Sequence, residues 1–270
     1  MAWYNLGNVY HKLDNYELAI EALSFATAID PKYHHAIYQK ALNEIYDEDY
    51  EKGIETFNEY LEFEPDSASA FFHIGEAYAK LENNKEALSY FEKTIELDDM
   101  YADAFYGQAY TLFAAKKYTD AYYSIKKAIK LEHEDPDFWH LSALINQKLG
   151  FENESEKAFK TALDIESSDP QIWIDYSNLL EGRKNLFKKI NILSEAFEHL
   201  NDNAEINYRL AANLALISNV DSAVYHLKKA LKTEPDKLDI FRSIYSAKNS
   251  TIEDLIDKFK LGELNFECKN

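Results

Sequence analysis

Apolar residues stand three or four positions apart in two stretches at the start of this chain, with a polar break between them. They are Trp3, Leu6 and Tyr10, and then Ala19, Leu23 and Ala26. This spacing places side chains on one face of an α-helix. Pro31 ends the second stretch, because proline lacks a backbone N–H and disfavours helix in the residue before it. The segment from Trp3 to Pro31 therefore predicts a pair of antiparallel helices.

The same pattern recurs every 34 residues without an insertion or a deletion. Large apolar residues open the units at Trp3, Ile37, Phe71, Phe105, Trp139, Trp173 and Phe241, and Asn207 is the exception. A small residue follows four positions later, at Gly7, Ala41, Gly75, Ala109, Ala143, Ser177 and Ala211. Helices approach to about 8–10 Å where the side chains at their crossing are small, so we expect Gly7 to cross Ala19. A single helix pair cannot bury its apolar face, whereas stacked pairs can.

A 34-residue unit with Trp3, Leu6, Gly7, Tyr10, Ala19, Leu23, Ala26 and Pro31 in these positions resembles the tetratricopeptide repeat (TPR). The resemblance covers essentially the whole chain. It implies an all-α, right-handed superhelical solenoid of antiparallel helix pairs with about seven to eight repeats. It also implies a concave face lined by the first helix of each pair, which in this family usually binds peptides or partner proteins.

The repeats are expected at 1–33, 34–67, 68–101, 102–135, 136–169, 170–203 and 204–237, followed by a capping helix pair at 238–260 and a tail at 261–270. Pro136 and Pro170 suit the first turn of a helix, where no N–H is missed. Repeat 170–203 is the most degenerate, since Lys189 replaces a small residue and its turn, 181–183, is polar. Ser250 and Glu253 have the spacing of a capping box.

Repeat 34–67 has Lys40 and Glu44 in the columns of Leu6 and Tyr10. Two explanations are open. Its first helix is rotated, or Lys40 and Glu44 form an i,i+4 ion pair worth a few tenths of a kcal/mol.

Charge and composition narrow the function. Lys and Arg number 29 against 48 Asp and Glu, a net charge of −19, which repels phosphate backbones, so we expect no nucleic-acid partner. No run of about 18 apolar residues is present, so no membrane insertion is expected. The start, MAWYNLGN, is not a signal peptide, and the single Cys268 is compatible with a reducing compartment, so we expect a cytoplasmic protein.

The N-terminus begins abruptly, because no capping residue precedes Trp3. We expect the chain to be a fragment that lacks earlier repeats. Its first apolar face would then be open to self-association.

Two columns of the first helices are candidates for the binding site. The residues after the opening position include Tyr4, Tyr38, Phe72, Tyr106 and Tyr208, and one turn further along lie Asn8, Glu76, Tyr110 and Asn178. The resemblance places these columns on the concave face. Aromatic rings give a large contact area at low entropic cost, which suits a bound segment, although rings also fill helix packing.

Other chemistries find little support. The family's carboxylate clamp needs Lys, Asn and Arg in successive first helices, and only Asn8 agrees, while Arg209 and Arg242 follow Glu205 and Asp239 by one turn. Acids near helix starts, such as Asp103 and Asp137, either present a negative strip to a basic partner or complement the helix dipole. The 8 histidines lack metal-site spacing, and no phosphate loop or nucleophile elbow occurs. We expect no metal, no cofactor and no enzyme. The remaining hypotheses are a protein-binding scaffold, an assembly element that stacks through its ends, and a regulatory array for an enzyme elsewhere.

Overall fold

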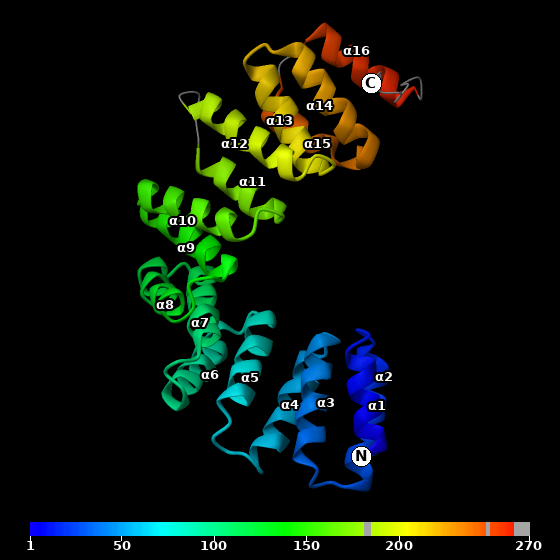
Figure 1. Cartoon of the computed structure of the whole chain (residues 1–270), viewed down its shortest axis with the longest axis vertical. Coiled ribbons are helices and arrows are strands. Elements are labelled where there is room, and N and C mark those ends of the chain that lie inside the picture. The colour runs from blue at the N-terminus through cyan, green and yellow to red at the C-terminus, as the bar shows by residue number, and fades with distance from the viewer. Residues whose placement is uncertain (181–184, 247–248, 262–270) are drawn as a thin grey trace. The chain divides into compact units, whose positions relative to one another are not determined.

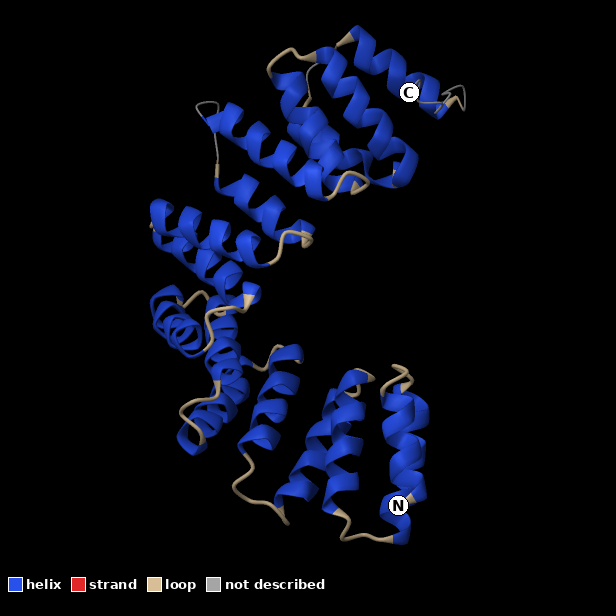
Figure 2. Cartoon of the chain, in the orientation of Figure 1, coloured by secondary structure: helices blue, strands red, loops and turns tan. Residues whose placement is uncertain are grey.

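The computed structural model describes residues 1–180, 185–246 and 249–261, which form sixteen α-helices and no strand (Figures 1 and 2). The helices are α1 (Ala2–His11), α2 (Tyr16–Ile29), α3 (His34–Tyr46), α4 (Tyr50–Leu61), α5 (Ala68–Lys80), α6 (Asn84–Leu97), α7 (Ala102–Ala114), α8 (Tyr118–Leu131), α9 (Pro136–Leu149), α10 (Glu152–Ile165), α11 (Pro170–Leu179), α12 (Leu186–His199), α13 (Ala204–Leu216), α14 (Val220–Thr233), α15 (Leu238–Ile244) and α16 (Ser250–Lys260). The prediction of an all-α array of helix pairs is confirmed.

The chain divides into two compact units, Met1–Leu149 (unit 1) and Gly150–Asn270 (unit 2). The division falls between α9 and α10, inside the segment 136–169 that the sequence assigns to one repeat. In unit 1 each odd-numbered helix from α1 to α7 packs against the even-numbered helix after it, and each even-numbered helix packs against the next odd-numbered one. The odd-numbered helices also contact one another, α1 with α3, α3 with α5, α5 with α7 and α7 with α9. Their shared surface is called here the first-helix face of unit 1.

The helix starts follow from local sequence. Asn15 caps α2 by accepting a hydrogen bond from the N–H of Leu18 at 3.3 Å, and Asn203 does the same for Ile206 at 3.0 Å. α9 and α11 begin at Pro136 and Pro170, as predicted. Met1 gives α1 no side-chain cap, which also agrees with the sequence.

The turns that connect the two helices of a pair share a backbone conformation that the sequence does not predict. Asp14, Glu48, Glu82, Lys116 and Ser218 all have a positive φ, between 53° and 63°, and Gly150 has φ 79°. From Asp14 to Gly150 these residues are spaced by the same 34 positions as the repeat, and Ser218 lies two periods further on. A residue with left-handed backbone conformation therefore recurs at the same position of these repeats, although the residue type at that position varies.

Small residues at the crossings are required by packing. A Cβ on Gly7 would lie 2.6 Å from Leu23 Cγ and 3.3 Å from the Ala19 carbonyl oxygen, so the predicted crossing is confirmed. The ring of Phe91 packs against two glycines. A Cβ on Gly75 would lie 2.9 Å from an atom of this ring, and a Cβ on Gly107 would lie 2.6 Å from one. Large side chains of second helices, Leu23 and Phe91, thus lie directly against glycines of first helices.

Repeat 34–67 keeps the ordinary orientation of its first helix. Ile37 and Ala41 are buried, as Phe71 and Gly75 are in the same columns of the next repeat, and Glu44 is fully buried in a column where Tyr10 stands in the first repeat. Lys40 Nζ lies 3.6 Å and Lys52 Nζ 3.8 Å from Glu44 Oε1. The ion-pair explanation therefore holds, and the rotation does not.

The capping-box prediction for α16 is wrong. Asn249 is the N-cap, and its Oδ1 accepts hydrogen bonds from the N–H groups of Thr251 and Ile252. Glu253 pairs with Arg242 instead, through two hydrogen bonds of 2.8 Å. The predictions for residues 181–183 and for the tail beyond 261 lie outside the described residues. In the part of the chain that the structure describes, no helix has the length and apolar content needed to cross a membrane.

Candidate functional site

The first-helix face of unit 1 brings side chains of neighbouring repeats together. The hydroxyl of Tyr38 on α3 is hydrogen-bonded to that of Ser69 on α5. One turn along α5, His73 Nδ1 lies 2.9 Å from Glu76 Oε2, and the His73 ring lies 6.2 Å from the Tyr38 ring. Tyr38 and Glu76, which the sequence selected separately, thus belong to one polar and aromatic cluster.

The start of α7 extends this cluster. The ring of Tyr101, which precedes α7, packs 5.0 Å from the ring of Phe72. Burial, followed by the proximity of Tyr38 and Asp103, raises the pKa of Tyr101 to about 12. Burial also raises the pKa of Asp103, and nearby carboxylates, Glu76 among them, raise it further. The cluster therefore lies in a negative electrostatic field.

Two further rings stand on α7. Tyr106 is half-buried and stacks on Phe138 of α9 at 5.0 Å, whereas Tyr110 is 55% exposed with its ring 6.4 Å from that of Tyr106. Burial, and then the nearby charge of Asp137, raises the pKa of Tyr106. Tyr110 is the most accessible of the predicted rings.

Tyr4 and Asn8 lie on α1, which contacts α3. Both side chains are half-buried, and the ring of Tyr4 packs 5.0 Å from that of Tyr33. Along the array these residues lie one repeat before Tyr38 and two repeats before Glu76.

Two of the predicted contact residues have little accessible surface. Phe72 is 8% exposed, and Tyr208 is 0% exposed with its hydroxyl donating to the Glu234 carbonyl oxygen at 2.9 Å. A side chain without accessible surface cannot contact a partner while the repeat is folded. We therefore leave Phe72 and Tyr208 out of the contact set proposed below.

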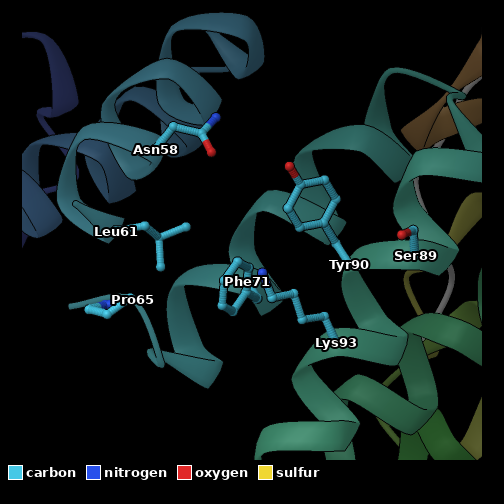
Figure 3. Close-up of a pocket in the computed structure, with 7 residues that line it drawn as sticks. All are labelled: Asn58, Leu61, Pro65, Phe71, Ser89, Tyr90 and Lys93. Carbon is cyan, nitrogen blue, oxygen red and sulfur yellow. The ribbon is translucent and has the colours of Figure 1, made fainter. Parts of the chain in front are cut away.

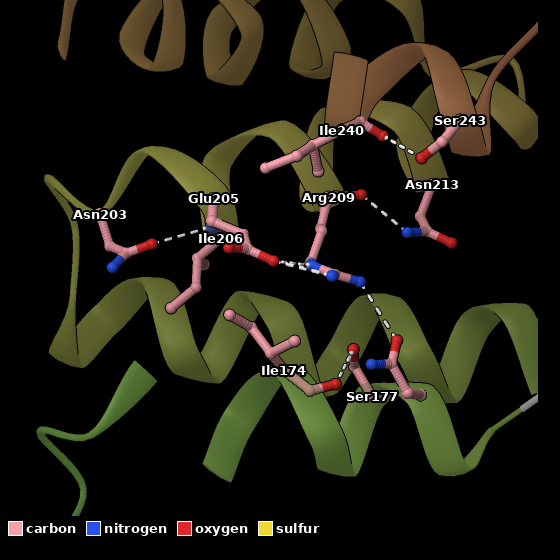
Figure 4. Close-up of polar contacts among 10 residues, drawn as sticks. Ile174, Ser177, Asn203, Glu205, Ile206, Arg209, Asn213, Ile240 and Ser243 are labelled. Carbon is pink, nitrogen blue, oxygen red and sulfur yellow. Dashed lines mark hydrogen bonds and ion pairs between the residues drawn. The ribbon is translucent and has the colours of Figure 1, made fainter. Parts of the chain in front are cut away.

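The remaining predicted contact residue, Asn178, lies in unit 2, and its side chain is hydrogen-bonded within that unit. Its Oδ1 accepts a hydrogen bond from Arg209 Nη1 at 3.1 Å, and the same guanidinium is paired with Glu205 at 2.7 Å (Figure 4). Figure 4 shows Glu205 and Arg209 of α13, and the hydrogen bond to Asn178 connects this ion pair to α11. Arg209 is thus compensated by the acid one turn before it, as expected, but Arg242 is paired with Glu253 and not with Asp239.

Sequence reasoning missed Ser69, His73 and Tyr101 as members of the cluster. Ser69 and His73 stand in columns that hold dissimilar residues in the other repeats, so the 34-residue comparison gave them no weight. Tyr101 shares a column with Tyr33, which is the one signal that could have pointed to it.

Among the described residues, no group of three or more His, Cys, Asp or Glu side chains is placed to hold a metal ion. The cluster offers hydroxyls, carboxylates and rings, which suit hydrogen bonding and aromatic contact with a protein segment.

Comparison with known proteins decides the family. One tetratricopeptide repeat model matches residues 1–33, and a second one matches 38–99 and 77–137. The chain is a tetratricopeptide repeat protein. No curated protein matches its sequence.

Solved TPR structures share the fold. A TPR protein from Parabacteroides merdae superposes with a TM-score of 0.65 at 12% identity, over 89% of this chain and 97% of its own. PilF of Pseudomonas aeruginosa gives 0.64 at 16% identity, over 78% and 95%. YrrB, described as a TPR protein with an unusual peptide-binding site, gives 0.54 at 19% identity, over 70% and 98%. At these identities the likeness concerns the TPR fold alone.

Proposed function

We propose that this TPR protein is a non-catalytic scaffold that binds a segment of a partner protein on the first-helix face of unit 1. The observation that carries the proposal is the cluster of Tyr38, Ser69, His73 and Glu76, continued by the exposed ring of Tyr110. The TPR family binds proteins and peptides on the corresponding surface, and YrrB is described as having a peptide-binding site.

The proposed contact set is Tyr4, Asn8, Tyr38, Glu76, Tyr106 and Tyr110. Rings lose little side-chain entropy when a partner covers them, so Tyr106 and Tyr110 provide contact area. The carboxylate of Glu76 and the hydroxyls of Tyr38 and Ser69 can accept N–H groups of a bound backbone. Carboxylates such as Asp103 form an acidic rim, which disfavours acidic segments and nucleic acid.

The experiment is a pull-down from an extract of the source cells, with the double variant Glu76→Lys and Tyr110→Ala beside the wild-type chain. Both side chains are partly or largely exposed, so helicity by circular dichroism should be unchanged. A matched control is Tyr123→Ala on the second helix α8, where the ring is 66% exposed. A partner lost only in the double variant supports the proposal, and a partner that both variants retain contradicts it.

A second candidate function is assembly through the first helix pair. The specific observation is the exposure of large apolar side chains on both α1 and α2, Trp3 and Phe25 among them. Contiguous apolar surface of this kind marks interaction sites in soluble proteins. A chain that sediments as a monomer at all concentrations would remove this candidate and leave the first proposal untouched.

We propose a cytoplasmic location for either function, because the chain has a single cysteine, Cys268, and so cannot form an intrachain disulfide.

A further inference from the structure

Two neighbouring helices of the first-helix face of unit 1 each carry a stripe of polar and aromatic side chains. The stripes are Ser69, His73 and Glu76 on α5, and Asp103, Tyr106 and Tyr110 on α7. The intervals of three and four positions put each set on one side of its helix. Because α5 and α7 contact each other, the two stripes lie next to one another.

The carboxylates of these stripes are poorly compensated. Asp103 is exposed and has no hydrogen-bond or ion-pair partner among the residues that the structure describes, while Glu76 is paired with His73 at 2.9 Å. Partial desolvation raises the pKa of Asp103, and the carboxylates of Glu132 and Asp135 raise it further. Glu76 acts in the same direction, so the folded chain leaves the negative charge of Asp103 without an attractive partner.

Lysine and arginine are almost absent from this part of the face. Unit 1 has no arginine, and α7 has no lysine. On α5 the one lysine is Lys80, the last residue of the helix, and within the described part of the chain it forms no ion pair with Glu76 one turn before it. The charge of the two stripes is therefore negative.

Lysines on second helices, in contrast, already lie over aromatic rings. The ammonium of Lys93 on α6 lies 3.8 Å from the ring centroid of Phe71, at the edge of a hollow of about 480 Å³ that α4, α5 and α6 line (Figure 3). Lys126 on α8 lies 5.3 Å from the ring centroid of Tyr122. A cationic segment would meet a like charge at the hollow, whereas it would meet carboxylates at the stripes of α5 and α7.

Helix dipoles account for only part of this negative charge. Asp103 and Asp137 stand in the first turns of α7 and α9, where a carboxylate complements the dipole. Glu76, however, stands in the second half of α5, and Glu132 directly follows the C-terminus of α8, where a negative charge is unfavourable. The placement of these two acids is not explained by helix stability.

We propose that the segment bound on the first-helix face of unit 1 is basic, with a lysine or arginine side chain between Glu76 and Asp103 and its aliphatic part against Tyr110. This inference rests on the proposed function and adds the chemistry of the bound segment. Ammonium and guanidinium groups pair with carboxylates and are attracted to the faces of aromatic rings. The net charge of −19 also favours the approach of such a segment.

The test is a selection of random peptides on the full chain at physiological salt, followed by affinity measurements on the selected peptides by fluorescence anisotropy. The double variant Glu76→Gln and Asp103→Asn removes two charges and keeps the side-chain shapes. Its matched control, Glu92→Gln and Asp120→Asn, removes two exposed charges from the second helices α6 and α8. Tyr110→Ala reports whether a peptide lies on the face at all, and circular dichroism checks that each variant is folded.

We expect the selected peptides to be rich in lysine and arginine. Their affinity for the variant of Glu76 and Asp103 should be about tenfold weaker, since one exposed ion pair contributes a factor of up to about five. The control variant should change the affinity by less than about twofold, because exposed charges farther away are screened. Rising salt should weaken binding to the wild type more than to the variant of Glu76 and Asp103.

Each contrary result has a distinct meaning. Peptides that require Tyr110 but bind the variant of Glu76 and Asp103 as tightly as the wild type leave the proposed function standing and overturn the basic segment. Peptides weakened equally by the control variant respond to net charge alone, which overturns the assignment to Glu76 and Asp103. A selection that yields no peptide dependent on Tyr110 or on the two acids overturns the proposed function and this inference together.

Discussion

His226 Nδ1 lies 2.9 Å from Asn207 Oδ1, and both side chains are buried within unit 2. Asn207 stands in the column where the other repeats have a large apolar residue, and its amide also donates to the carbonyl oxygens of Asn201 and Asn203 at 2.8 Å. The His226 ring packs edge-on against Phe197 at 4.7 Å. The seventh repeat thus has a buried hydrogen-bond network between its two helices at a position where the other repeats have a large apolar residue.

This network makes the stability of unit 2 depend on pH. Burial, and then the charge of Lys229, lowers the pKa of His226 to about 4 from 6.5. The unfolded chain therefore takes up a proton that the folded chain refuses, so the free energy of unfolding should fall as pH drops from about 6.5 towards about 4. The difference of the two pKa values, at 1.36 kcal/mol per unit, gives a loss of about 3 kcal/mol at most.

Urea titrations at several pH values between 7 and 4 measure this loss. The His226→Gln variant keeps a hydrogen-bond donor for Asn207 but does not titrate at this position, so it should lose less stability than the wild type between about pH 6.5 and about pH 4. A variant with the same pH dependence as the wild type would show that another group is responsible.

Gly107→Ala should destabilise unit 1. A Cβ at this position would lie 2.6 Å from the Phe91 ring, which is 1% exposed and also borders Gly75. Overpacking of a core typically costs about 1–3 kcal/mol, and the better helix propensity of alanine offsets about 1 kcal/mol of it, so we expect a net loss of up to about 2 kcal/mol.

The double variant Gly107→Ala and Phe91→Leu identifies the cause. If the ring is what the new methyl group meets, the two changes together should cost less than the sum of their separate effects in thermal or chemical denaturation. Strictly additive losses would contradict the proposed clash.

Glu44→Leu should stabilise unit 1. Both carboxylate oxygens of Glu44 are buried without a hydrogen-bond partner, and the two lysine ammonium groups lie 3.6 and 3.8 Å away. Leu112, Leu180 and Leu214 occupy the same column in other repeats, so the shape is tolerated. Replacing a buried ion pair by an apolar side chain is often neutral or stabilising, and we expect a gain of about 1 kcal/mol at neutral pH.

The pH dependence distinguishes this effect from simple repacking. Burial raises the pKa of Glu44 above 4.5, and Thr56 and the two lysines offset only part of the increase. The folded chain therefore holds a proton that the unfolded chain releases, so the wild type should lose stability relative to Glu44→Leu as pH rises through the raised pKa. A difference between the two chains that is constant from pH 4 to pH 8 would contradict a buried charge at this position.

Gly150→Ala should destabilise the chain although there is space for the methyl group. No atom lies within 4 Å of a Cβ at this position, but the backbone has φ 79°. A left-handed conformation costs an L-residue about 1–2 kcal/mol, and calorimetry should detect a loss of about 1 kcal/mol. Gly150→Asn should lose less, since asparagine tolerates this conformation better. Equal losses in the two variants would argue against backbone strain.

The helix pairs and their 34-residue repeat could be predicted from the sequence. They depend on residue types that recur at the same position of several repeats, so no single residue decides the prediction. Gly7, facing Leu23 and Ala19, is an example, and the helix pairs follow from such crossings. The left-handed turn residues could not be predicted, since Asp14, Lys116 and Ser218 have side chains with no common property.

The candidate site could be predicted only in part, because residues of one column differ in accessibility. Tyr38 and Tyr208 are equivalent in sequence, yet Tyr208 is buried and bonded to the Glu234 carbonyl oxygen, whereas Tyr38 is half-buried and bonded to Ser69. The exposed fraction of each ring depends on which residues of the chain pack against it. A comparison of columns shows which residues are alike, and it takes the structure to show which of them are covered.

The position of Phe91 has a consequence for how unit 1 unfolds. This ring belongs to α6 and borders Gly75 of its own pair and Gly107 of the next. A repeat array whose pairs met only through small contacts would lose its pairs one at a time from the ends. Here a single ring lies at the crossing of its own pair, α5 and α6, and also against α7 of the next pair, so separating the two pairs exposes a core residue. The segment from α5 to α8 should therefore exchange its amide protons as one cooperative unit, with the same opening free energy in both pairs.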